Sequence, residues 1–195
     1  AAQSPSVVAR IAIGGTIAGF EDYEPFLSQH SGRDIDDPML GSPMLYTSGT
    51  TGHPKGVYRW PPRPSNMLAA LFQPMIEFRP DTDLALLTGP AYHAAPLNLN
   101  AVAALAQGVG LVMMDRWDAE ETLRVIEAHQ IVYTHVVATM FNRMLKLPEQ
   151  TRQRYDLSSL RAVLHGAAPC PLHVKRAMIE WWGPIIYEYY AGSEG

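Results

Sequence analysis

The residues YTSGTTGHPKGV, at positions Tyr46–Val57, form the stretch around which the rest of the chain is organised. Within it, three glycines, four hydroxyl side chains and Lys55 fall inside ten residues. Glycine lets the backbone take unusual dihedral angles, so that amides, hydroxyls and the lysine can surround an anion. Each charge-assisted hydrogen bond contributes roughly 1.5–3 kcal/mol, so several on one triphosphate outweigh the cost of ordering the loop. The stretch therefore predicts a phosphate-binding loop.

The alternative interpretation of this stretch is an ordinary loop, because glycine, threonine, serine and proline are common loop formers. The apolar run Met44–Tyr46 favours the binding loop, since it stops abruptly there, as a buried strand does at the edge of a sheet. The common P-loop pattern is not met, because Pro54 stands at the second glycine and Gly56 follows Lys55. We therefore expect a different kind of phosphate loop.

Composition limits the classes of protein that the chain can represent. Its 195 residues, 47% apolar and 17% charged, can bury a core. A net charge of −4 without a long basic run argues against nucleic-acid binding. No apolar stretch approaches the roughly 18 residues of a membrane span, and no signal peptide is apparent, so we expect a cytoplasmic protein. The single cysteine, Cys170, excludes an internal disulfide, fits a reducing compartment and is expected to be inert.

Strand and helix patterns alternate along most of the chain. Short elements are expected near Arg10–Ile13 and Tyr23–Gln29. Strands are then expected at Asp83–Thr88, Leu111–Met114, Ile131–Val136, Leu160–Leu164 and Pro184–Tyr190. Helices are expected at Leu97–Gln107, after the cap Asp118–Glu121, at Thr139–Leu147 and at Pro171–Trp182, with a polar connection at Pro148–Asp156. This alternation predicts an α/β fold with mostly parallel sheets flanked by helices.

Three further candidate elements follow predicted strands, at the edge where ligands bind in open α/β sheets. They are Pro90–His93, Gly166–Pro169 and Tyr190–Glu194. Each also has a plain structural interpretation: a lone histidine is usually structural, small residues can form a simple turn, and a terminal acid can be solvated. Their shared position relative to the strands favours a binding site.

Taken together, these motifs resemble the adenylate-forming superfamily, which includes acyl-CoA synthetases, luciferases and the adenylation domains of peptide synthetases. Tyr46–Val57 is similar to the family's phosphate-binding signature, and the other three elements are similar to later motifs in the same order. The resemblance extends from about Gly41 onward and is closest to fatty-acid and other acyl-CoA synthetases. It implies that residues 41–195 are part of an AMP-binding domain, that residues 1–40 are an N-terminal edge segment and connection, and that the small C-terminal domain is absent.

The resemblance also implies roles for individual residues. Those implied in holding the phosphates of ATP are Thr47, Ser48, Gly49, Thr50, Thr51, Gly52 and Lys55. Those implied around adenine and the α-phosphate are Gly166, Ala167, Ala168, Pro169, Tyr190, Ala191 and Ser193. Tyr92 and His93 are implied in the acid pocket, Thr50 and Glu194 in holding Mg²⁺, and Lys55, Thr50 and Glu194 in catalysis. Ala167 and Ala191 stand where the family usually has glycine.

The activity implied is ATP-dependent activation of a carboxylic acid to an acyl-adenylate, followed by thioester formation with coenzyme A. Tyr92–Ala95 lacks the aspartate that binds the amino group of amino acids, so a fatty acid is the expected substrate. Thr88–Gly89 is followed by Pro90 where the family has a ribose-binding aspartate, and neither the hinge nor the catalytic lysine of the family is found. We therefore expect the isolated chain to be inactive or nearly so.

Four alternatives stay open at this point. Two are enzymatic, namely luciferase-like chemistry and amino-acid adenylation. The others are a nucleotide-binding module without turnover and a degenerate relative that serves as an interaction surface. The expected partners are small molecules only, and the oligomeric state is left open.

Overall fold

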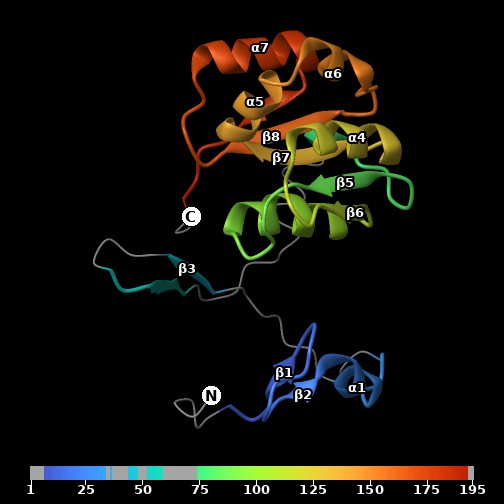
Figure 1. The fold of residues 1–195 in the computed structure, drawn as a ribbon, viewed down its shortest axis with the longest axis vertical. Helices are drawn as coiled ribbons and strands as arrows, with labels where there is room; N and C mark the ends of the chain where they lie inside the picture. Colours follow the sequence, from blue (N-terminus) through green and yellow to red (C-terminus); the bar gives the residue numbers. More distant parts are fainter. Residues whose placement is uncertain (1–6, 34–35, 37–43, 48–51, 59–73, 193–195) are drawn as a thin grey trace. The chain divides into compact units, whose positions relative to one another are not determined.

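The computed structural model describes residues 7–33, 36, 44–47, 52–58 and 74–192 of the chain. It divides into two units, Ala1–Leu40 and Gly41–Gly195. In the first unit, strand β1 (Ile11–Ala12) pairs in parallel with β2 (Glu21–Asp22), and helix α1 (Tyr23–Ser28) follows directly (Figure 1). The two short elements expected in this part of the sequence are confirmed.

A five-stranded sheet forms the centre of the second unit. Its strands are β5 (Leu84–Leu87), β6 (Gly110–Met113), β7 (Tyr133–Val137), β8 (Ala162–Gly166) and β9 (Ile186–Glu188). They lie in the order β6-β5-β7-β8-β9, and every neighbouring pair is parallel. The predicted α/β class and its mostly parallel sheet are therefore confirmed.

Helices cover both faces of this sheet. Among the helices described in the second unit are η1 (Pro96–Val102, a π-helix), α3 (Ala103–Leu105), α4 (Ala119–His129), α5 (Ala138–Leu145), α6 (Glu149–Arg154) and α7 (Leu172–Trp182). In Figure 1, α4, α5 and α7 lie on one side of the sheet, and the segment that contains η1 and α3 lies on the other.

Residues that alternate along the strands supply the two apolar cores. Val136 and Val163 join the core beneath α4, α5 and α7. Tyr133 of β7 and Leu164 of β8 point to the other face and join the second core, together with Ala104 of α3. This alternation follows from the period of two in a strand. Because helices cover both faces, the strands are apolar on both, as is typical of parallel sheets.

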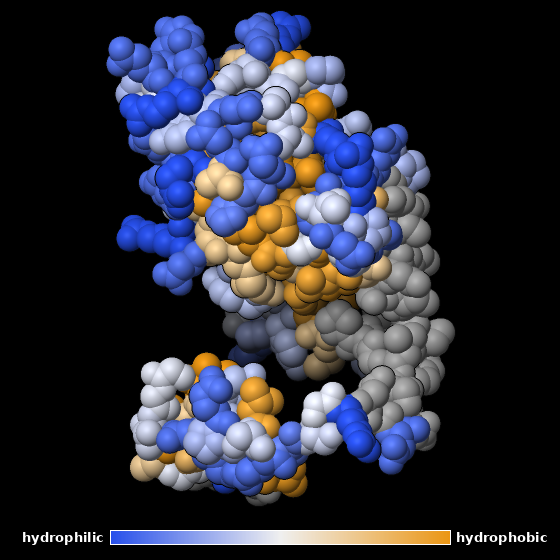
Figure 2. All heavy atoms as spheres, turned by 90° about the vertical axis from the view of Figure 1, so that its right-hand side faces the viewer, coloured by the Kyte–Doolittle hydropathy of each residue, from blue (hydrophilic) through white to orange (hydrophobic). Residues whose placement is uncertain are grey.

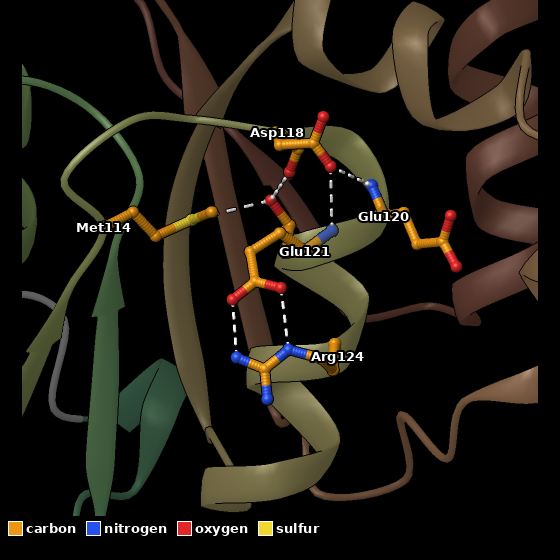
Figure 3. Close-up of polar contacts among 6 residues, drawn as sticks. Met114, Asp118, Glu120, Glu121 and Arg124 are labelled. Carbon is orange, nitrogen blue, oxygen red and sulfur yellow. Dashed lines mark hydrogen bonds and ion pairs between the residues drawn. The ribbon is translucent and has the colours of Figure 1, made fainter.

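The acidic residues that open α4 have structural roles, as expected from the sequence. Asp118 Oδ1 accepts hydrogen bonds from the backbone N–H groups of Glu120 and Glu121, each at 3.0 Å (Figure 3). Arg124 Nε donates to the Glu121 carboxylate at 2.7 Å, and this hydrogen bond lowers the pKa of Glu121. The bonds to Asp118 cap the N-terminus of α4, and the bond between Glu121 and Arg124 is an ion pair within its first turns.

Two expectations from the sequence are wrong. The polar connection expected at Pro148–Asp156 contains helix α6, which follows Pro148 and buries Thr151. The run Met44–Tyr46 was expected to be a buried strand, but β3 (Leu45–Thr47) forms an antiparallel hairpin with β4 (Lys55–Val57), and among the described residues it has no other strand partner. Tyr46 is 65% exposed there, because a two-stranded ribbon has no second layer of its own.

Apolar residues gather on one face of the second unit (Figure 2). Among the large apolar side chains that this unit exposes are Leu105 of α3 and Met113 at the end of the edge strand β6. None of the helices in the described parts of the chain is both long enough and apolar enough to span a membrane.

Candidate active site

The parallel strands bring three of the predicted elements to one edge of the sheet. Strands β5, β7, β8 and β9 run in the same direction, so their carboxyl ends meet at that edge. Tyr92 and His93 follow β5, residues 167–169 follow β8, and Tyr190 follows β9. Gly166 is itself the last residue of β8. This edge is where ligands bind in open α/β sheets.

Gly166 and Ala167 show why small residues stand at the end of β8. A Cβ atom on Gly166 would lie 2.5 Å from the ring of Tyr189, closer than any side chain tolerates. Ala167 has a φ of +70°, in the left-handed region that favours glycine. An alanine there carries a strain of roughly 1–2 kcal/mol. Such strain persists only where the surroundings enforce it, and it is typical of ligand sites.

Tyr92 and His93 lie on an exposed turn that leads into η1. The His93 N–H donates to the carbonyl of Pro90 at 3.0 Å, and the His93 carbonyl accepts from the N–H of Leu97 at 3.0 Å. The Tyr92 side chain is 88% exposed, and His93 is exposed as well. Both rings are therefore accessible from solvent, and their role in an acid pocket stays a prediction.

His135 and Tyr189 form a hydrogen-bonded pair that the sequence analysis did not identify. His135 is the middle residue of β7 and is buried, and its Nε2 atom is 3.0 Å from the Tyr189 hydroxyl. Burial lowers the pKa of His135 to about 4, with smaller contributions from His93 and His165. The imidazole is therefore neutral at pH 7. Thr88, just after β5, donates its hydroxyl hydrogen to the His135 carbonyl.

His165 is a second buried histidine at the same edge, on β8. Its ring packs edge-on against Phe141 of α5, with ring centroids 5.2 Å apart. Neither ring nitrogen has a hydrogen-bond partner among the described residues. Burial, followed by the charge of Lys175, lowers the pKa of His165. His135 and His165 both carry the signal that pointed to His93, because each lies at the carboxyl end of a predicted strand.

The phosphate-loop stretch spans the β3–β4 hairpin. Thr47 and Lys55 are paired across the two strands, so their side chains lie next to each other on one face of the ribbon. Gly52 has a φ of +81°, which only glycine adopts readily. Ser48, Gly49, Thr50 and Thr51 lie outside the described residues.

The segment after β9 is described as far as Gly192. The Tyr190 side chain is fully exposed, and Ala191 is exposed as well. Ser193 and Glu194 lie outside the described residues. In the part of the chain that is described, no three His, Cys, Asp or Glu side chains are grouped to hold a metal ion. The predicted Mg²⁺ ligands, Thr50 and Glu194, are not in that part, so their role stays a prediction.

Cys170 follows the small-residue segment and is partly buried. Burial raises the pKa of its thiol, which disfavours the reactive thiolate. This agrees with an inert cysteine.

Comparison with known proteins identifies the family. The sequence model described as "AMP-binding enzyme" matches residues 21–195. The chain belongs to this family of AMP-binding enzymes, the adenylate-forming superfamily. The match begins about 20 residues before Gly41, where the resemblance was expected to start.

Two curated relatives and one solved structure illustrate the similarity. Indoleacetate–CoA ligase of Aromatoleum aromaticum is 30% identical over 93% of this chain and 36% of its own length. The long-chain-fatty-acid–CoA ligase of Bacillus subtilis is 30% identical over 77% of this chain and 27% of its own. The inhibitor-bound N-terminal domain of FACL13 from Mycobacterium tuberculosis superimposes with a TM-score of 0.67 and 26% identity, covering 90% of this chain and 44% of that one. The chain therefore spans 36% and 27% of the lengths of these two curated relatives.

Proposed function

We propose that this chain carries the ATP-binding and acid-binding residues of an AMP-forming acid–CoA ligase. One observation carries the proposal: in a member of the AMP-binding family, three elements meet at one edge of a parallel sheet. They are Tyr92 and His93 after β5, the small residues at the end of β8, and Tyr190 after β9. Sequence order and strand direction together support one ligand site at this edge.

The first half-reaction joins the acid to AMP. A carboxylate oxygen attacks the α-phosphorus of ATP, and the bond from that phosphorus to the leaving pyrophosphate breaks. The exposed ring of Tyr190 is available to stack on adenine, and the small residues Ala167, Ala168 and Pro169, which follow the buried Gly166, are exposed as well. Lys55 and the hydroxyl groups of Thr47–Thr51 bind the β- and γ-phosphates, so that positioning and charge neutralisation supply most of the rate.

Magnesium would neutralise charge on the phosphates, and Thr50 and Glu194 are the residues proposed to hold it. An oxygen-only ligand set of this kind suits Mg²⁺, which is usually bound through one or two carboxylates together with substrate phosphates.

The second half-reaction transfers the acyl group to coenzyme A. The thiol sulfur bonds to the acyl carbonyl carbon, the bond from that carbon to the phosphate oxygen of AMP breaks, and the thiol proton is released. Thioester and AMP are the products. We assign no residue of this chain to the transfer step.

For the acid, we propose a fatty acid. The turn that contains Tyr92 and His93 has no acidic residue between Pro90 and Ala95 to pair with an α-amino group. One of the matched relatives is a fatty-acid ligase, whereas another is an indoleacetate ligase. An aromatic acetic acid is therefore the competing substrate class.

The test is acid-dependent exchange of pyrophosphate into ATP, measured on a longer protein that contains this sequence. We expect exchange with a fatty acid, little with an amino acid, and thioester formation once coenzyme A is added. Lys55→Ala should lower exchange by about 100-fold or more, as removal of a transition-state charge partner does, while Lys146→Ala, on the exposed end of α5, should not.

Other outcomes of this test would contradict the proposal. Adenylate without thioester would indicate luciferase-like chemistry, and exchange with amino acids alone would indicate amino-acid adenylation. ATP binding without any exchange would leave a nucleotide-binding module. We expect the isolated 195-residue chain to show only background exchange, and full-rate exchange by that chain would overturn this expectation.

A further inference from the structure

Tyr189 is held in place by contacts with two strands. Its backbone N–H donates to the carbonyl of His165 on β8 at 3.0 Å. Its ring fills the space above Gly166, where a Cβ atom would be 2.5 Å away. Its hydroxyl group lies 3.0 Å from Nε2 of the buried His135 on β7. The three contacts involve the backbone, the ring and the hydroxyl group, so the whole residue is fixed.

The next residue, Tyr190, differs sharply from Tyr189. Tyr189 is partly buried, whereas the side chain of Tyr190 is fully exposed. Strand β9 ends at Glu188, and the last backbone hydrogen bond to β8 among the described residues is the one from Tyr189 to His165. The orientation of the chain at Tyr190 therefore depends on how firmly Tyr189 is held.

A ligand segment that is ordered before binding avoids part of the entropy cost of binding. Because burial lowers the pKa of His135 to about 4, its neutral ring can accept a hydrogen bond from the Tyr189 hydroxyl at pH 7.

We propose that Tyr189 is a positioning residue: its hydrogen bond with His135 and its packing on Gly166 hold the segment that begins at Tyr190 in the orientation that nucleotide binding requires. This inference rests on the proposed function, because the nucleotide role of Tyr190 belongs to it. It assigns His135, Gly166 and Tyr189 to one unit that spans β7, β8 and the end of β9.

The first test measures amide hydrogen exchange at Tyr189, whose N–H donates to the carbonyl of His165, and it needs no ligand. Tyr189→Phe removes the hydroxyl group and leaves the His135 nitrogen without its partner, so we expect exchange to be about tenfold faster. Tyr187→Phe, on β9 two residues earlier, is the matched control and should leave exchange unchanged.

A double variant tests the contact with Gly166. Gly166→Ala should push the Tyr189 ring out of place and speed exchange by at least about tenfold. Once Tyr189→Ala has removed the ring, adding Gly166→Ala should cause no further increase. Additive effects, or unchanged exchange in Tyr189→Phe while the protein stays folded, would overturn the inference.

The second test measures ATP·Mg²⁺ binding by the same variants. Tyr189→Phe should weaken ATP affinity about three- to tenfold, and in a longer active protein it should raise KM for ATP while leaving KM for the acid unchanged. Equal changes in both KM values, or none, would contradict a positioning role. If the unmodified chain binds no ATP, the proposed function fails, and the exchange experiment still decides whether Tyr189 anchors the segment.

Discussion

Strand β8 and the β3–β4 hairpin both carry motif residues, but they obtain their geometry in opposite ways. All five residues of β8 are buried between β7 and β9, whereas no residue of β3 or β4 is buried. In the hairpin, the groups expected to bind phosphate are glycines, hydroxyls and a lysine of one short stretch of sequence. At the sheet edge, residues from several strands must be brought together by the core. One region can therefore be recognised from a short stretch, and the other only from the fold.

The largest expected effect is a difference in unfolding free energy between a variant in the sheet unit's core and a variant beside the hairpin. Phe141 of α5 is fully buried against His165 and Trp182, so Phe141→Ala should cost about 3–5 kcal/mol of unfolding free energy. Tyr58→Ala, just after β4 and 74% exposed, should stay within about 0.5 kcal/mol of the unmodified chain. Urea titration of both variants measures the difference, and similar costs would remove the distinction between the regions.

The next largest expected effect is on the unfolding free energy as the pH changes. Burial lowers the pKa of folded His135 to about 4, from an ordinary value of 6.5. Between those values the unfolded chain binds the extra proton, so stability is lost as the pH falls from 6.5 towards 4. At about 1.4 kcal/mol per pH unit, this group should cost about 2 kcal/mol on going from pH 7 to pH 5.

A matched pair of variants checks the source of that loss. His135→Gln keeps a polar side chain that does not titrate, so it should reduce the difference in unfolding free energy between pH 7 and pH 5. His53→Gln, exposed in the hairpin segment, should leave the difference as it is. If His53→Gln reduced the difference between pH 7 and pH 5 more than His135→Gln did, His135 would not be the titrating group.

A smaller effect concerns backbone strain at the sheet edge. Because Ala167 has a φ of +70°, Ala167→Gly should stabilise the chain by about 1 kcal/mol. Ala168→Gly is the neighbouring control and should stabilise nothing, since Ala168 is not among the residues with positive φ. Thermal unfolding of the two variants makes the comparison, and equal shifts in Tm would contradict strain at Ala167.

The smallest expected effect on stability is that of Lys55→Ala. Lys55 is exposed on β4 and belongs to neither apolar core, so the unfolding free energy should change by less than about 0.5 kcal/mol. Loss of nucleotide binding in a variant of unchanged stability would then report on the site alone. A large loss of stability, measured by the same urea titration, would mean that Lys55 supports the fold.

The central sheet could be predicted from the sequence because its strands are apolar runs separated by helical patterns. Helix α6 was missed because all six of its residues, Glu149–Arg154, are polar and it buries one of them, Thr151. The Met44–Tyr46 run was misjudged because three apolar residues do not reveal whether a strand has neighbours on both sides. Its partner, Lys55–Val57, lies just beyond the loop and closes a two-stranded ribbon.

Part of the candidate site could be named from the sequence for a related reason, and its role stays a prediction. Pro90–His93 and Gly166–Pro169 were found because each follows an apolar run within one stretch of sequence. The His135–Tyr189 pair joins residues 54 positions apart, and it exists because β7, β8 and β9 are neighbours in the sheet. Strand order cannot be read from any single stretch, so this contact needed the structure.

The most direct test of the account is a calorimetric titration of ATP·Mg²⁺ into the 195-residue chain. Lys55→Ala and Glu194→Ala are measured beside two exposed controls, Lys146→Ala and Glu180→Ala. The account predicts binding of one ATP, weakened about 10- to 100-fold in each site variant and unchanged in the controls, as expected for loss of a charged hydrogen bond. A folded chain that binds no ATP, or binds it equally in all five proteins, would contradict the account.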